Sequence, residues 1–221
     1  KCEIGSRLLR PDQISSDIYY ILEGQVRILG VSPFGSGQVT IEKPHVNSLY
    51  GWLSLLRAEP SDFIQCSTEV TALSLDAALF IELYLENPNF ALYFDCFSPS
   101  YEQFGVAASA LLLSPQLSEE IDDNFLTGFS DSEALVVNPN ASEIPLPSCQ
   151  SNSWYLSTSS VPGIKVGSQI VSSGLPLPII TDFNLRHRLI SLPSLLSDSL
   201  RNSLEKEKLY ELLVRCAEEG G

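Results

Sequence analysis

The chain lacks the residues that several common kinds of protein site require. Its two histidines, His45 and His187, lie far apart in the sequence, so a histidine-based metal site is not expected. Its five cysteines are odd in number, irregularly spaced and without a Cys-x-x-Cys pair, which favours idle or buried thiols in a reducing compartment over a disulfide framework. We therefore expect no metal and no other cofactor.

Basic residues are missing from a long central stretch. No Lys or Arg occurs between Arg57 and Lys165, while fifteen Asp and Glu fall in that interval, and the net charge of the chain is −14. Such a surface repels the phosphates of nucleic acids and of anionic lipids. No apolar run reaches the roughly 18 residues that span a bilayer. We therefore expect no nucleic-acid partner, no direct membrane insertion and a cytoplasmic location.

Methionine is absent altogether, and the sequence begins at Lys1. A complete translation product would begin with methionine, so we interpret the chain as a piece of a longer protein. The 44% apolar content indicates a packed core, and 221 residues are enough for one large domain or for a standard domain with a smaller one.

The first 113 residues carry short strand patterns and then become helical. Asp76 and Asn87, the latter followed by proline, are typical helix starts. The pattern predicts an α+β fold, an antiparallel β-roll or jelly roll flanked by helices, over residues 1–113. Alternating or β-branched runs indicate strands over 18–22, 25–29, 39–41 and 68–75, and helices are expected over 77–86, 89–97 and 101–113.

Two further parts follow. Residues 114–153 combine acidic residues with proline steps and have no fixed apolar period, which indicates an acidic, partly disordered linker that is either a solvated connector or a docking segment for a basic partner. Residues 154–221 are predicted to form a small β unit with a terminal amphipathic helix over 197–219, which packs on its own domain or forms a dimer or interdomain contact. The strand patterns of this unit lie at 154–156, 164–170, 175–181 and 189–190.

Two segments carry a resemblance to a known family. Residues 5–12, followed by 18–26, resemble the opening of the cyclic nucleotide-binding domain, the family of the catabolite activator protein. Residues 51–62 read Gly-Trp-Leu-Ser-Leu-Leu-Arg-Ala-Glu-Pro-Ser-Asp. They are similar to the family's phosphate-binding cassette, which usually runs Gly-Glu-Leu-Ser-Leu-Leu, three residues, then Pro-Arg-Ser-Ala-Thr. The resemblance covers residues 3–97 and implies a regulatory β-roll.

The resemblance also implies which residues would hold a ligand. In the family, a short helix turns its amides toward the cyclic phosphate, a Glu accepts the ribose hydroxyl and an Arg pairs with the phosphate. Here Trp52 stands at the Glu position and Ser61 at the Arg position. An indole offers no acceptor and a serine hydroxyl carries no charge. Whether the candidate ligand-binding residues at the cassette positions still bind a ligand is left open. They are Gly51, Trp52, Leu53, Ser54, Arg57, Pro60, Ser61 and Asp62.

The replacements at Trp52 and Ser61 are both expected to lower the affinity for a cyclic nucleotide. Hydrogen bonds to charged groups contribute roughly 1.5–3 kcal/mol each, so the loss of both costs about 3–6 kcal/mol, on the order of 10²–10⁴-fold in affinity. Glu59 and Asp62 are expected to add repulsion toward an anion. Arg57 is the cation nearby, and it compensates only if its side chain turns inward. We expect Trp52 to fill the vacated pocket or the core rather than to stack on a base.

A longer pattern narrows the resemblance. Residues 22–29, the cassette, 87–91, a tryptophan-led strand at Trp154 and 188–193 look like the cytoplasmic N-terminal region of peptidase-containing ABC exporters of cyanobacteria, the group linked to heterocyst differentiation. In that group the region precedes a cysteine-peptidase domain, a membrane domain and an ATPase. The resemblance implies an intramolecular or exporter-domain partner, and a homodimer is left open.

Four functions can be weighed on these patterns. The favoured one is a non-catalytic regulatory or interaction module with a degenerate cassette. The alternative is a working sensor of a cyclic nucleotide or of a less anionic ligand beside Trp52. A transcription regulator is disfavoured because the last helix carries as many acids as bases and is no basic recognition helix. An enzyme is disfavoured because the chain has no Walker A loop, no Gly-x-Ser-x-Gly elbow and no cysteine-peptidase signature.

Overall fold

The computed structural model describes residues 1–44, 46–113, 121–130, 132–137, 152–158, 165–170 and 187–193. Its first part is an antiparallel β-roll made of two sheets, with strand orders β1-β6-β3-β4 and β5-β2-β7. Apolar side chains from both sheets, such as Ile18, Ile28 and Ile64, are fully buried in one core. The strands are β1 (Arg7–Leu9), β2 (Asp17–Glu23), β3 (Val26–Val31), β4 (Gln38–Glu42), β5 (Leu49–Tyr50), β6 (Ile64–Cys66) and β7 (Thr71–Asp76).

A short helix of six residues lies between β5 and β6 of the roll. This helix, α1 (Trp52–Arg57), begins after Gly51, whose φ of 97° is in the left-handed region. A Cβ atom at Gly51 would lie 2.8 Å from the carbonyl oxygen of Asp17. The close approach of β2 and the positive φ together require glycine at the start of the cassette.

Two helices, α2 (Ala77–Glu86) and α3 (Pro88–Asp95), cover one side of the roll. The carboxylate of Asp76 accepts a hydrogen bond from the amide of Ala78 at 2.8 Å, and the side chain of Asn87 accepts from the amides of Asn89 and Phe90 at 3.1 Å. Both predicted helix starts are confirmed, because these side chains satisfy amides that the first turn leaves unpaired.

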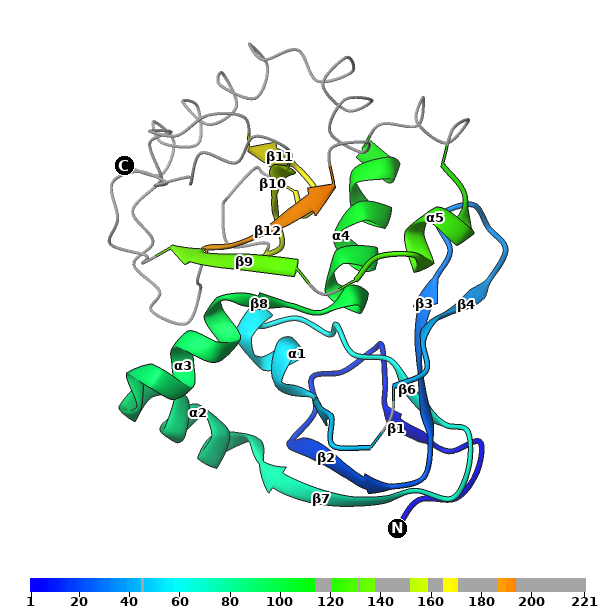
Figure 1. Cartoon of the computed structure of the whole chain (residues 1–221), viewed down its shortest axis with the longest axis vertical. Helices are drawn as coiled ribbons and strands as arrows, with labels where there is room; N and C mark the ends of the chain where they lie inside the picture. Colours follow the sequence, from blue (N-terminus) through cyan, green and yellow to red (C-terminus); the bar gives the residue numbers. More distant parts are fainter. Residues whose placement is uncertain are drawn as a thin grey trace.

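The chain then builds a second layer above the roll, with α4 lying between its sheet and the β3–β4 hairpin (Figure 1). The sheet has the order β11-β10-β12-β9-β8, and its core is shared with α4 and α5. Strand β12 is central, because it pairs with both β9 and β10. The elements are β8 (Phe97–Ser98), α4 (Ser100–Leu113), α5 (Asp123–Thr127), β9 (Ser132–Val137), β10 (Asn152–Leu156), β11 (Gln169–Ile170) and β12 (His187–Pro193).

The predicted fold class, α+β with an antiparallel roll flanked by helices, is confirmed. The described part of the segment 114–153, which the sequence predicts to be an acidic, partly disordered linker, contains α5 and β9. The run Ala-Leu-Val-Val within β9 is a short strand pattern that the surrounding acidic residues obscured. The expected strand at 175–181 and helix at 197–219 lie outside the described residues, and the boundaries of the three parts stay a prediction.

No helix among the described residues is long and apolar enough to cross a bilayer. The same stretches contain no cluster of three or more His, Cys, Asp or Glu side chains that could hold a metal ion.

Candidate functional site

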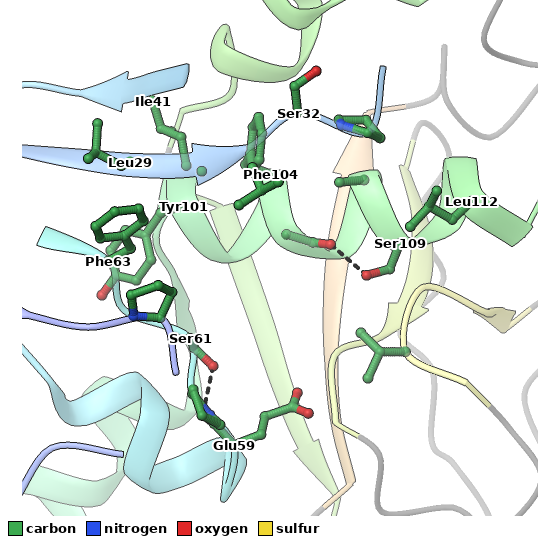
Figure 2. A pocket seen from close by; sticks show the side chains of 18 of the residues that line it. Leu29, Ser32, Ile41, Glu59, Ser61, Phe63, Tyr101, Phe104, Ser109 and Leu112 are labelled. Atoms are coloured by element: carbon green, nitrogen blue, oxygen red, sulfur yellow. Dashed lines mark hydrogen bonds between the residues drawn. The ribbon is translucent and has the colours of Figure 1, made fainter. Parts of the chain in front are cut away.

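A cavity of about 580 Å³ lies between the roll, the loop that follows α1, and α4 (Figure 2). Strands β3 and β4 contribute Leu29 and Ile41, and α4 contributes Phe104, Ser109 and Leu112. Most of the lining is apolar. The described residues around it are Pro11, Leu29, Gly30, Val31, Ser32, Pro33, Gly35, Ile41, Arg57, Glu59, Pro60, Ser61, Phe63, Tyr101, Phe104, Gly105, Ala108, Ser109, Leu112 and Val166.

The guanidinium of Arg57 at the edge of this cavity is held by the chain itself. Its Nη1 donates to the hydroxyl of Ser61 at 2.9 Å, its Nη2 to the carboxylate of Glu59 at 2.5 Å, and its Nε to the carbonyl oxygen of Ser157 at 2.8 Å. The side chain of Arg57 is 9% exposed. Each of the three nitrogens already donates one hydrogen bond, and Glu59 neutralises the charge, so the guanidinium offers an incoming anion little unpaired positive charge.

A carboxylate of the protein also lies beneath helix α1. Asp62 Oδ2 accepts from the amide of Ser54 at 3.0 Å and from its hydroxyl at 2.5 Å. Burial raises the pKa of Asp62, although hydrogen bonds from Ser54 act in the opposite direction. The amide of Ser54, in the first turn of α1, is therefore already paired with an acceptor of the chain.

Trp52, at the family's Glu position, is buried in the core of the roll with 3% exposure. Its ring packs on Phe94 at a centroid distance of 5.0 Å and on Phe97 at 6.2 Å. The guanidinium carbon of Arg188 lies 5.8 Å from the ring centroid. The expectation that Trp52 fills the core is confirmed. Trp52 also borders a second, smaller cavity of about 430 Å³, and Tyr101 lines both cavities.

Arg188 and Glu102 form a buried, two-point ion pair beside Trp52. Nε of Arg188 donates to Glu102 Oε1 at 2.7 Å and Nη2 donates to Oε2 at 2.9 Å, while the carbonyl oxygens of Phe94 and Phe97 accept the remaining bonds at 3.0 and 2.6 Å. Burial by itself raises the pKa of Glu102, but the charge and hydrogen bonds of Arg188 outweigh it and lower that pKa. The pair ties β12 to α3, β8 and α4.

Ser157 joins this ion pair to the edge of the cavity. Its hydroxyl donates to Glu102 Oε1 at 2.6 Å, its amide donates to the carbonyl oxygen of Arg188 at 2.8 Å, and its own carbonyl accepts from Arg57. A continuous polar path therefore runs from Ser61 through Arg57 and Ser157 to Glu102. The cassette and the C-terminal sheet are physically connected.

The structure separates the eight predicted cassette positions into two groups. Arg57, Pro60 and Ser61 line the cavity, whereas Trp52, Leu53, Ser54 and Asp62 are buried, and Gly51 forms the turn before α1. The sequence predicts that Glu59 and Asp62 repel an anion. In the structure Asp62 is buried beneath α1 and bound to Ser54, and the charge of Glu59 is paired with Arg57.

The sequence reasoning missed the residues that α4 and β12 contribute. Gly105, Ser109 and Leu112 form the α4 wall, and Glu102 and Arg188 hold that helix against the C-terminal sheet. A signal existed, because Glu102 is the one charged residue of helix α4, and Arg188 lies within strand β12 directly before the apolar residues Leu189 and Ile190. A charged side chain in the core is almost always paired, but nothing in the sequence matches Glu102 with Arg188 across 86 positions.

Comparison with known proteins gives a likeness of structure and no relative by sequence. No family model matches the chain, and no curated protein matches it. Solved structures that it is similar to include the catabolite activator protein of Thermus thermophilus, at 20% identity and a TM-score of 0.37 over 53% of this chain and 48% of that one.

Two further likenesses are of the same kind. A cyclic nucleotide-binding domain from Methylobacillus flagellatus matches at 19% identity and a TM-score of 0.36, covering 53% of this chain and 60% of that one. The N-terminal domain of a transcriptional regulator from Streptomyces coelicolor A3(2) matches at 20% identity and 0.35, covering 55% and 76%. The chain spans about half the length of the Thermus protein. At these TM-scores the likenesses establish neither a family nor a ligand.

Proposed function

We propose that this chain is a non-catalytic regulatory or interaction module of the cyclic-nucleotide-binding type whose cassette has lost its hold on the nucleotide. The observation that carries the proposal is the state of Arg57, whose three nitrogens are bound to Ser61, Glu59 and the carbonyl of Ser157. The packing of Trp52 in the core and the pairing of Ser54 with Asp62 support it. The phosphate of a cyclic nucleotide would meet a guanidinium whose charge is already paired with Glu59, and its ribose hydroxyl would meet Trp52 in place of a carboxylate.

Titration calorimetry with cyclic AMP and with cyclic GMP tests this proposal. The unaltered chain is expected to give no binding heat, and micromolar binding of either nucleotide would contradict the proposal. Ser61→Arg returns a guanidinium to the family's Arg position, and one recovered charge-assisted contact is expected to raise affinity by about 10–100-fold. Ser109→Arg, which adds the same charge on the α4 wall of the cavity, is the matched control and is expected to gain less.

We propose further that the module is the cytoplasmic N-terminal part of a cyanobacterial peptidase-containing ABC exporter, and that its partner is another domain of that exporter. The support is the sequence pattern that links the cassette with Trp154 and residues 188–193. Transport, ATP hydrolysis and peptide cleavage then belong to the rest of the polypeptide. Reading the coding sequence downstream of Gly221 tests this, and a polypeptide that ends without a cysteine-peptidase domain would contradict it.

The cavity itself favours a second function, that of a sensor for a ligand other than a cyclic nucleotide. A space of about 580 Å³ bounded mainly by apolar side chains is of the size that small-molecule sites have. This function keeps the regulatory role and changes only the ligand.

A further inference from the structure

We propose that the cavity between the roll and α4 holds a small, uncharged and largely apolar molecule. The inference rests on the proposed regulatory function, and it names the ligand class of the same site. Three features of the described residues carry it: the apolar lining (Figure 2), the neutralised charge at its edge, and the open space at Gly105 of α4.

The lining selects for apolar surface. Leu29 and Ile41 approach from the roll, Phe63 from the segment before β6, and Phe104 and Leu112 from α4. Each square ångström of apolar ligand surface that leaves water here contributes about 25 cal/mol. The aromatic and aliphatic walls therefore favour a flat or branched hydrocarbon body over a sugar phosphate.

The charges at the edge of the cavity cancel. Arg57 and Glu59 are the two ionisable acid–base groups among its described lining residues besides the phenol of Tyr101, and they are paired with each other at 2.5 Å. An anion placed there would lose its hydration without gaining an unpaired cation, and a cation would meet an occupied carboxylate. The site therefore discriminates against ligands of either charge.

The α4 wall has room for a ligand because of one glycine. A Cβ atom built on Gly105 would meet nothing within 4 Å, although Gly105 lines the cavity from within a helix. Close by, α4 packs tightly on the roll, because Gly30 of β3 lies so close to Phe104 that a Cβ atom there would be 2.3 Å from the ring. The open space at Gly105 therefore lies one residue from a closely packed contact.

A pair of fluorescent probes tests both the apolar and the neutral character of the site. N-phenyl-1-naphthylamine is uncharged, and 8-anilino-1-naphthalenesulfonate has the same two ring systems with an added sulfonate. We expect the neutral probe to bind the full 221-residue chain with one site, and at least about tenfold more tightly than the sulfonate. Equal affinities, or tighter binding of the sulfonate, would overturn the proposal.

Two variants locate the probe. Gly105→Leu fills the open space from a helical position without backbone strain, and it is expected to weaken the neutral probe at least about tenfold. Leu112→Trp narrows the mouth at a side chain that is 69% exposed, so it keeps the fold even if the first variant does not. Ala78→Leu, at an exposed position of α2 outside the cavity, is the control and should change nothing. Unchanged binding in both cavity variants would place the probe elsewhere and overturn the proposal.

Glu59→Gln tests the charge argument directly. The amide cannot neutralise Arg57, so the sulfonate probe should gain affinity by about tenfold while the neutral probe changes little. If the unaltered chain binds the neutral and the sulfonate probe equally well, only the inference about the ligand class fails. Heat from cyclic AMP in the calorimeter would instead contradict the proposal that the cassette no longer binds the nucleotide, so the two failures can be told apart.

Discussion

The two cores of this molecule are built in different ways. The core of the roll is made of apolar side chains that lie within the first 101 residues, among them Ile18, Leu53 and Phe80, all with 0% exposure. The second core, shared by α4, α5 and the C-terminal sheet, draws its members from between Phe104 and Leu192 and borders the buried ion pair of Arg188 with Glu102. The comparison indicates that segments far apart in the sequence, as in the second core, are placed by a directional contact such as this ion pair. The core of the roll, built from one continuous part of the chain, is placed by the burial of apolar side chains.

The ion pair is suited to that task because its geometry is specific. A guanidinium that reaches both oxygens of one carboxylate and two main-chain carbonyls accepts a single placement of β12 against α3, β8 and α4. Apolar contacts tolerate many arrangements of similar energy. The cost of burying both charges is offset only when every one of these bonds is present.

Arg188→Met is expected to produce the largest effect, because it leaves the carboxylate of Glu102 buried and unpaired. We expect the free energy of unfolding to fall by about 3–5 kcal/mol. Ile28→Val, a cut of one methylene in the core of the roll, should cost about 0.5–1.5 kcal/mol. Urea unfolding followed by circular dichroism measures both.

The double variant Glu102→Leu with Arg188→Met sharpens the comparison. Replacing both charges by apolar groups removes the unpaired carboxylate, so most of the lost stability should return. If the single variant loses less than about 1 kcal/mol, or the double variant loses more than the single one, the ion pair is not what holds the second layer.

Gly24→Ala should have the next largest effect, in the roll. Gly24 has a φ of 91°, and a Cβ atom there would lie 2.2 Å from the carbonyl oxygen of Glu69. We expect a loss of about 1–3 kcal/mol in the free energy of unfolding from strain alone, with the clash adding to it. Gly105→Ala is the matched control in α4, where open space and helical geometry predict a gain of about 0.5–1 kcal/mol. Similar changes at the two sites would contradict this account.

Asp62→Asn should have the smallest effect, and its sign depends on pH. Burial raises the pKa of Asp62 in the folded protein, so the folded state takes up a proton before the unfolded state does, and the unaltered chain gains stability as pH falls through that raised pKa. The asparagine variant keeps an acceptor for Ser54 and carries no buried charge. We expect it to be more stable at pH 7, by on the order of 1 kcal/mol.

The advantage of Asp62→Asn should shrink as the pH falls from 7 toward the ordinary value of 3.8. Thermal unfolding of both proteins across this range measures the difference. If the difference in stability between the two proteins stays constant or grows as the pH falls, the pKa of Asp62 is not raised in the folded protein.

Much of the roll could be predicted from the sequence, and the reasons are local. The β-branched and aromatic run at 18–22 and the alternating run at 25–29 correspond to β2 and β3. The helix starts at Asp76 and Asn87 were correct because capping depends on neighbours within three residues. The strand β9 was missed, since its four apolar residues stand among acids and pair with β12, about fifty positions later, while Ser132 and Glu133 pair with β8. Pairing over such distances leaves no pattern in either segment.

The candidate site also has features that residue type predicts and features that depend on contacts between distant segments. Reading the cassette in register was enough to find that Trp52 and Ser61 replace an acceptor and a cation, because residue type alone fixes charge and hydrogen-bonding capacity. Only the tertiary structure decided that Arg57 is bound by Glu59 and Ser157, that Asp62 is turned beneath α1, and that Gly105 opens a wall of the cavity. These contacts depend on which surfaces meet when the chain folds, and a linear sequence does not record that.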